Sequence, residues 1–308
     1  MLAIALALGA SLCWGSGDFL GGLTTRRASL WAVIVGSQAV GLVGATLVVV
    51  LAGRGWPGLH AVWPVMLGGL ASVVAISCFY KALAIGSMSI VAPISATNAM
   101  IPFLVGLALG ERPSPMQLAG VALAAAGVLL VASERARAGD IIGVAALPNE
   151  PAVEPAVVRA AGAAATPVSR RDQRKAIALA LTAAVAMGLV LVGFDATARY
   201  DPLWAMLGGR ISSVIVFGVG FLVLRPHLRM RRSALPFVVA VGLLDTGANG
   251  LFAVATTKGY LSIVAVMGSV YPVVTVLLAY GLLRERIAPH QMVGAAGTLA
   301  GIALIAAG

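Results

Sequence analysis

Charged side chains are scarce in this chain. Asp, Glu, Lys and Arg make up 10% of its 308 residues, whereas hydrophobic residues make up 60%. A soluble domain carries about 25% charged residues. A fold surrounded by water cannot hide so much apolar surface, so this composition excludes an ordinary soluble protein. It predicts a chain embedded in the lipid bilayer.

Cysteine and histidine are also rare. The two cysteines, Cys13 and Cys78, lie inside apolar stretches, and the three histidines lie scattered at the ends of such stretches. Without a CxxC motif or a Cys/His cluster, we expect no disulfide framework, no metal site and no cofactor. The stretch GSGDFLGG at 15–22 lacks the GxGxxG spacing and the Walker lysine of a phosphate-binding loop, so we expect no nucleotide-driven activity.

Acidic residues are outnumbered, and the net charge is +10. In a soluble protein this excess would suggest a nucleic-acid partner. Here most of the Lys and Arg lie between apolar stretches, as they do in loops beside membrane spans. We therefore expect no nucleic acid as a partner.

Long apolar stretches are what the sequence has in abundance. About 20 apolar residues cross a bilayer as a helix, and the alternating pattern of a membrane β-barrel is absent. The stretches of this kind are 2–22, 30–52, 62–84, 88–109, 115–132, 176–197, 203–224, 234–256, 260–283 and 288–306. The predicted fold class is an all-α integral membrane protein with ten transmembrane helices.

An internal repeat divides these helices into two sets. The hexamer AIALAL occurs at 3–8 and again at 176–181, and Leu30-Trp31-Ala32 recurs as Leu203-Trp204-Ala205. When the spacing between the two copies is increased by one residue, GERPSPMQLAG (110–120) also matches RERIAPHQMVG (284–294). We interpret the chain as one duplicated unit.

The repeat predicts the domain organisation. Residues 1–132 form a first five-helix repeat, 133–175 a polar, mobile linker rich in charge and proline, and 176–308 a second five-helix repeat. Because five spans are an odd number, the second repeat enters the membrane from the opposite side. The two repeats are therefore predicted to be inverted, related by a two-fold axis in the membrane plane.

Two equivalent polar joints connect neighbouring stretches. They begin with Glu111-Arg112 and Glu285-Arg286, and each ends in a proline that suits the first turn of a helix, Pro115 and Pro289. We interpret the Glu-Arg pairs as structural parts of helical hairpins.

Polar groups deep inside a span are costly and usually functional. Asp245 lies near the middle of its stretch, with Asn249 on the same helix face, and Arg210 is within reach of Asp245. An Arg210–Asp245 pair has two readings that both stay open, a substrate site and a structural ion pair. Asp18 is placed at the mouth of a cavity, and Asp195 is expected to reach outward to water from the end of its stretch.

Large side chains with polar tips complete the candidate site. The predicted substrate-binding residues are Trp14, Asn98, Arg210, Asp245, Asn249 and Tyr271. The Asp245 carboxylate has two alternative uses, exchange of a coupling proton or binding of a cationic group. The predicted partners are a small-molecule substrate and the lipid bilayer.

Several of these motifs together resemble the drug/metabolite transporter superfamily of the EamA type. They are the two five-helix repeats, Trp14-Gly15 in the first helix, the Glu-Arg joints, and Tyr271-Pro272 in the ninth helix. The resemblance implies a secondary carrier in the cell membrane for amino acids, amines or drug-like metabolites, which exports them by alternating access around a midplane cavity. Two features depart from the family's pattern: the linker is long, and Asn98 stands at the position equivalent to Pro272. In the same alignment of the repeats, Tyr271 is equivalent to Thr97.

Other readings stay open at this stage. An integral-membrane enzyme and a receptor or scaffold that does not transport are the alternatives to a carrier. Loop charge places both termini outside the cytoplasm, whereas the family resemblance places them inside. The sequence leaves open the substrate, the direction, the coupling ion and the oligomeric state.

Overall fold

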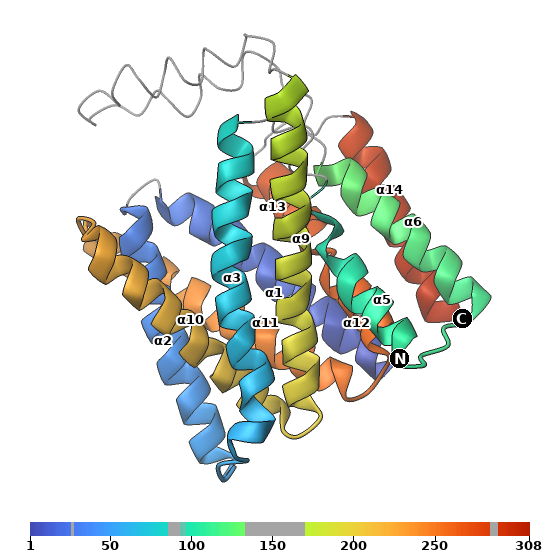
Figure 1. Ribbon diagram of the computed structural model, residues 1–308. Coiled ribbons are helices and arrows are strands. Elements are labelled where there is room, and N and C mark those ends of the chain that lie inside the picture. The colour runs from blue at the N-terminus through green and yellow to red at the C-terminus, as the bar shows by residue number, and fades with distance from the viewer. Residues whose placement is uncertain (26–27, 86–93, 95, 133–169, 284–288) are drawn as a thin grey trace.

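The computed structural model describes residues 1–25, 28–85, 94, 96–132, 170–283 and 289–308, and these residues are almost entirely helical (Figure 1). The elements are α1 (Leu2–Thr25), α2 (Leu30–Leu51), α3 (Leu59–Ile85), η1 (Ala96–Ala99), α5 (Met100–Ala108), α6 (Pro115–Ala132), α9 (Arg170–Ala198), α10 (Pro202–Leu224), η3 (Arg232–Ala234), α11 (Leu235–Thr256), α12 (Leu261–Gly268), α13 (Tyr271–Leu283) and α14 (Pro289–Ala307).

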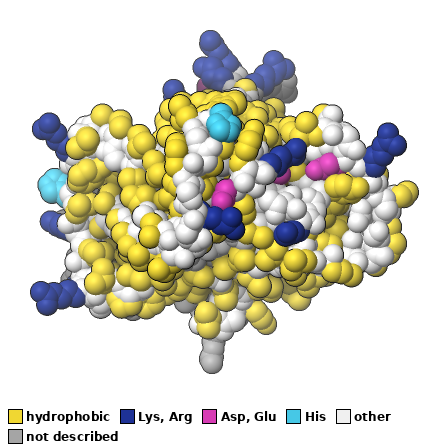
Figure 2. All heavy atoms as spheres, turned by 90° about the horizontal axis from the view of Figure 1, so that it is seen from below, with side chains coloured by type: hydrophobic (Ala, Val, Ile, Leu, Met, Phe, Trp, Pro, Cys, Tyr) yellow, Lys and Arg dark blue, Asp and Glu magenta, His cyan; other side chains and the backbone are white. Residues whose placement is uncertain are grey.

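Most of these helices can cross a membrane. Within the described ranges, 8 spans are long and apolar enough, and two shorter apolar helices cover Thr97–Ala108 and Pro115–Val131. Hydrophobic side chains dominate the surface even in the view onto one end of the bundle (Figure 2). The predicted all-α membrane fold with two five-helix repeats is confirmed. The helix α9 begins at Arg170, six residues before the predicted stretch.

Local sequence explains where several helices begin. The helices α6 and α14 start at Pro115 and Pro289, as the joints predicted. Ser114 and Gln117 form a reciprocal cap on α6: the Gln117 N–H donates to Ser114 Oγ at 3.1 Å, and the Ser114 N–H donates to Gln117 Oε1 at 2.9 Å. Asp201 caps α10 by accepting the N–H groups of Leu203 and Trp204.

The two repeats interlock in symmetry-related pairs (Figure 1). The helix α1 packs against α11, and its repeat counterpart α9 packs against α3, the counterpart of α11. Two further contacts join counterparts directly, α2 with α10 and α6 with α14. Both chain termini lie at one end of the bundle, which we call the terminal end.

Glycines allow α6 and α14 to touch along their backbones. A Cβ atom added to Gly120 would lie 2.7 Å from the carbonyl oxygen of Gly301, and one added to Gly294 would lie 2.7 Å from that of Gly127. Gly308 lies beside Ser114, so the two helices run in opposite directions. Because the two-fold operation exchanges these two contacts, the equal distances report the inverted symmetry directly.

The fourth and ninth spans are not continuous helices. The fourth changes from the 3-10 helix η1 to α5 at Met100, and the ninth breaks at Ser269 and Val270 between α12 and α13. The break in the ninth span comes just before Pro272, whose ring cannot continue a helix from the residues before it. Both breaks lie at the middle of the bundle, beside the cavity described next.

Candidate functional site

A cavity of about 300 Å³ lies between the two repeats. Five of the predicted site residues line it: Trp14, Asn98, Asp245, Asn249 and Tyr271. Arg210, the sixth, does not reach the cavity surface and lies behind Asp245. The structure therefore brings all six predicted residues together, from α1, η1, α10, α11 and α13.

Arg210 is held in a polar network behind the cavity wall. Its Nη2 donates to Asp245 Oδ2 at 2.5 Å, and its Nη1 donates to Gln38 Oε1 at 2.8 Å. The expected Arg210–Asp245 pair is thus present. The Arg210 side chain is 3% exposed, whereas that of Asp245 is 38% exposed. The carboxylate therefore faces the cavity and the guanidinium does not.

Gly41 on α2 leaves the space that the Arg210 guanidinium occupies. A Cβ atom added to Gly41 would lie 2.8 Å from Arg210 Nε and 2.5 Å from Thr246 Oγ1. The Nε atom is buried without a hydrogen-bond partner among the described residues. An unpaired buried donor is unfavourable, so the two bonds on the other nitrogens must hold Arg210 in this position.

A second carboxylate, Asp18 of α1, lines the same cavity. It is exposed, and none of the ion pairs found in the described ranges involves it. Asp18 lies one helical turn beyond Trp14, so the two side chains share a face of α1. The sequence placed Asp18 at the cavity mouth but did not include it in the site.

Aromatic rings form one wall. The ring of Trp14 lies 5.7 Å from that of Phe252 and 6.4 Å from that of Tyr271, measured between centroids. Phe252 is almost fully buried and also lines the cavity. Sequence reasoning missed Phe252 because it selected side chains with polar tips. Its position three residues after Asn249, on the same helix face, was the available signal.

Backbone packing at the two broken spans corrects the register of the repeat. A Cβ atom added to Gly15 would lie 2.6 Å from the Tyr271 carbonyl oxygen, and one added to Gly188 would lie 2.6 Å from the Asn98 carbonyl oxygen. Since Gly15 and Gly188 are counterparts, Tyr271 corresponds to Asn98. The predicted alignment of Tyr271 with Thr97 is wrong, because the one-residue insertion comes later in the span.

At the terminal end, Glu111 joins the two repeats. Its carboxylate accepts the Leu261 N–H at 2.6 Å and the Ser262 N–H at 2.9 Å, at the N-terminus of α12. Gly106 on α5 allows this contact, because an added Cβ would lie 2.8 Å from the Glu111 carboxyl carbon and 3.0 Å from the Ser262 nitrogen. The structural role predicted for the Glu111-Arg112 pair is therefore more specific than a hairpin turn: Glu111 caps a helix of the other repeat.

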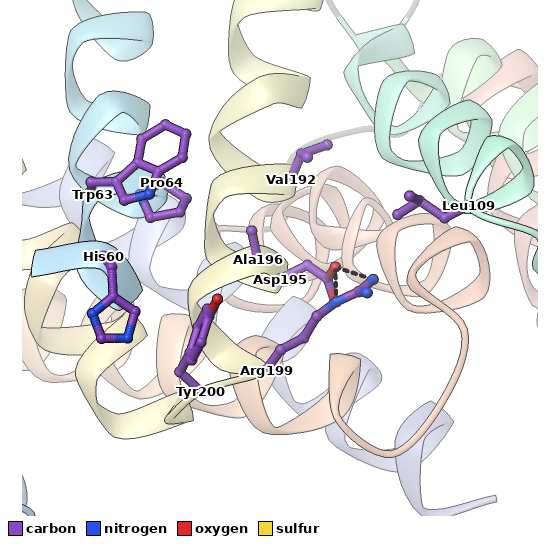
Figure 3. Close-up of a pocket in the computed structure, with 9 residues that line it drawn as sticks. All are labelled: His60, Trp63, Pro64, Leu109, Val192, Asp195, Ala196, Arg199 and Tyr200. Carbon is purple, nitrogen blue, oxygen red and sulfur yellow. Dashed lines mark hydrogen bonds and ion pairs between the residues drawn. The ribbon is translucent and has the colours of Figure 1, made fainter. Parts of the chain in front are cut away.

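A separate cavity of about 370 Å³ opens beside this region and shares no lining residue with the first (Figure 3). His60 and Tyr200 stand on one side of it, and Arg199 donates to Asp195 Oδ2 at 2.8 Å on the other. The Asp195 side chain is 5% exposed. The expectation that Asp195 reaches outward to water is therefore wrong: the Asp195 carboxylate stays inside the fold, and the exposed Arg199 pairs with it from the surface.

Comparison with known proteins identifies the family. The sequence model of the EamA-like transporter family matches residues 1–133 and 174–307. The chain belongs to the EamA-like transporter family. It is therefore an integral, multi-pass membrane protein and a membrane transporter of the drug/metabolite transporter superfamily.

A solved structure supports the fold of this EamA-like transporter. That structure, described only as "Crystal structure of protein", has a TM-score of 0.72 and 17% sequence identity to it. The match covers 98% of this chain and 95% of the other. No curated protein matches the chain.

Proposed function

We propose that this protein is a secondary-active or facilitative transporter of a small metabolite in the cell membrane and works as an exporter. One observation carries the proposal: a cavity lined by both polar and aromatic side chains lies between two inverted repeats, at the point where two spans are broken. Broken helices at the midplane free backbone groups for a substrate, and inverted repeats provide two related conformations that open to opposite sides.

The size and lining of the cavity support a small amphipathic substrate. Ligand pockets begin at about 300 Å³, and this cavity has about that volume. Amides from Gln38, Asn98 and Asn249 offer both donors and acceptors, while Trp14 and Phe252 offer apolar surface. An amino acid, an amine or a small aromatic metabolite matches this mixture.

The contacts at the terminal end support alternating access. Phe194 and Phe252 line the cavity on the side nearer that end, because each lies beyond the middle of a helix that runs toward it. Further along, α5 packs against α12, and Glu111 connects the two repeats. In our proposal these contacts close one side of the cavity and separate when the repeats rock against each other.

Reconstituted transport tests this proposal. Purified protein is first screened by thermal shift against a library of metabolites, because a bound ligand stabilises the folded state by mass action. Each stabilising compound is then followed as a radiolabelled substrate in proteoliposomes, with and without an imposed pH gradient. We expect flux without added nucleotide.

A matched pair of variants separates transport from leakage. Ser213 lines the cavity, whereas Ile215, two residues along α10, is 54% exposed on the outer surface. Ser213→Trp is expected to block flux by filling the cavity, and Ile215→Trp is expected to leave it intact. Equal flux through both variants, or flux that requires ATP, would refute the proposal.

A further inference from the structure

We propose that the transported molecule carries a positively charged group and that Asp18 is the residue that selects for it. This inference rests on the proposed function, since it assigns the chemistry of the substrate to the central cavity.

The only cation next to the cavity, within the described ranges, is already neutralised. Arg210 uses two of its nitrogens on Asp245 and Gln38 and is 3% exposed. A buried guanidinium with a bonded carboxylate in front of it presents no free positive charge to a ligand. Seen from the cavity, Arg210 and Asp245 form a neutral, polar wall.

Asp18 adds a negative charge that no ion pair among the described residues cancels. The charged residues that line the cavity are Asp18 and Asp245, and the Asp245 charge is matched by Arg210. The other polar lining groups, such as Gln38 and Ser213, are neutral amides and hydroxyls. Counted over the described residues, the cavity therefore has a net charge of about −1, and its low-dielectric walls strengthen the effect of that charge.

The surroundings of Asp18 suit a cationic group. Trp14 lies one helical turn away on the same face of α1, and its ring contacts those of Phe252 and Tyr271. An ammonium group bonded to Asp18 would lie beside these rings, and aromatic faces attract cations. An anionic substrate would gain neither contact.

The duplication does not require a carboxylate at this position. The repeat counterpart of Asp18 is Leu191, which lines the same cavity from α9. The fold is therefore built with an apolar side chain at one of the two equivalent positions. The asymmetry assigns Asp18 to the ligand.

Thiol chemistry measures the charge of the cavity without a known substrate. Ser213→Cys provides a lining thiol in a chain whose Cys13 and Cys78 are replaced by Ser, and Ser269→Cys provides a second position. The reconstituted protein reacts at pH 8 with two methanethiosulfonates of similar size, one with a trimethylammonium group and one with a sulfonate. The ratio of the two rates, divided by the ratio for a thiol in solution, reports the local potential.

The expected ratio favours the cation and depends on Asp18. A unit charge about 10 Å away, at an effective dielectric constant of about 20, changes the rate of a charged reagent about tenfold. Asp18→Asn is therefore expected to lower the ratio of cationic to anionic rates at least about tenfold. Asp172→Asn, at the first turn of α9 and far from the cavity, is the control and should change it less than about twofold.

Each contrary result overturns the assignment. A ratio that favours the anion, or one that Asp18→Asn leaves unchanged, contradicts a negative cavity governed by Asp18. Reaction with only an uncharged methyl reagent would show that the cavity rejects charge of both signs. No reaction at either cysteine would contradict the open cavity itself.

A shape-matched ligand series tests the substrate class. Phenethylamine, phenylethanol and phenylacetate share one ring and differ in charge. The amine is expected to raise the melting temperature of the purified protein more than the other two, and Asp18→Asn should remove that preference. Transport of a neutral or anionic compound that Ser213→Trp blocks and Asp18→Asn does not affect would overturn this inference while leaving the proposed transporter standing.

Discussion

The Glu111 contact predicts how easily the terminal end of the transporter opens. In Glu111→Gln one side-chain oxygen remains as an acceptor, and the NH2 group faces a backbone N–H that has lost its partner. The change removes one of two short hydrogen bonds, those to Leu261 at 2.6 Å and to Ser262 at 2.9 Å, and it removes the charge at the N-terminus of α12.

The size of the effect follows from these contacts. A hydrogen bond to a charged group contributes about 1.5–3 kcal/mol, and a charge at an exposed helix end contributes about 0.3–1 kcal/mol. Because Glu111 is partly exposed, water compensates part of the loss, and we expect about 2 kcal/mol against the closed state. About 1.4 kcal/mol is a factor of ten, so the open fraction should rise about thirtyfold.

Labelling of a buried thiol measures the open fraction. Ser262 is fully buried beside Glu111, so Ser262→Cys in the chain without Cys13 and Cys78 reacts with a maleimide only after α5 and α12 separate. Glu111→Gln should raise the labelling rate about thirtyfold. The matched control is Asp201→Asn, which removes a helix-capping carboxylate at the same end of the bundle. Unchanged labelling in Glu111→Gln, or an equal increase in the control, would refute a specific closing role for Glu111.

The polar network and its glycine give two further predictions. Asp245→Asn leaves the Arg210 guanidinium without its charged partner, so transport should fall at least about tenfold and the free energy of unfolding by about 1–3 kcal/mol, less than for a fully buried pair because Asp245 faces the cavity. Adding Arg210→Gln should restore part of the stability measured by chemical unfolding. A double variant no more stable than Asp245→Asn alone would contradict the pairing. Gly41→Ala pushes a methyl group onto Arg210, so it should reduce transport and lower the free energy of unfolding by about 1–3 kcal/mol. The control Gly44→Ala, whose Cβ would lie 3.5 Å from Leu243, should be tolerated. A similar loss of stability in both variants would argue against the close contact at Gly41.

The sequence predicted those parts of the site that depend on depth in the membrane. Counting residues along two stretches placed Arg210 and Asp245 near each other, because a straight helix converts sequence position into height. The duplicated sequence likewise predicted the inverted repeats, since an odd number of spans leaves no other arrangement.

Features that depend on local backbone geometry were beyond that reasoning. Hydropathy treats a broken span as it treats a continuous one, so the break before Met100 was not predicted, whereas Pro272, a residue that can break a helix, was the signal for the break before Tyr271. The one-residue insertion has no sequence marker between 98 and 110, and only the contacts of Gly15 and Gly188 fix its position. Glu111 was interpreted as part of a turn because its partners, Leu261 and Ser262, lie in the other repeat.

In the proposed cycle, Gly106 makes the two faces of this transporter energetically unequal. It lets Glu111 lie against α12, but its counterpart in the second repeat is Ala279 or Tyr280, neither of which is a glycine. A side chain at this position disfavours the same close contact in the other conformation of the proposed cycle, so we expect the two conformations to differ in free energy. A substrate that arrives at the face that is usually closed binds only to the rarely populated conformation. Its apparent affinity is therefore reduced in proportion to the population of that conformation. One cavity can thus have two apparent dissociation constants, one for each side of the membrane.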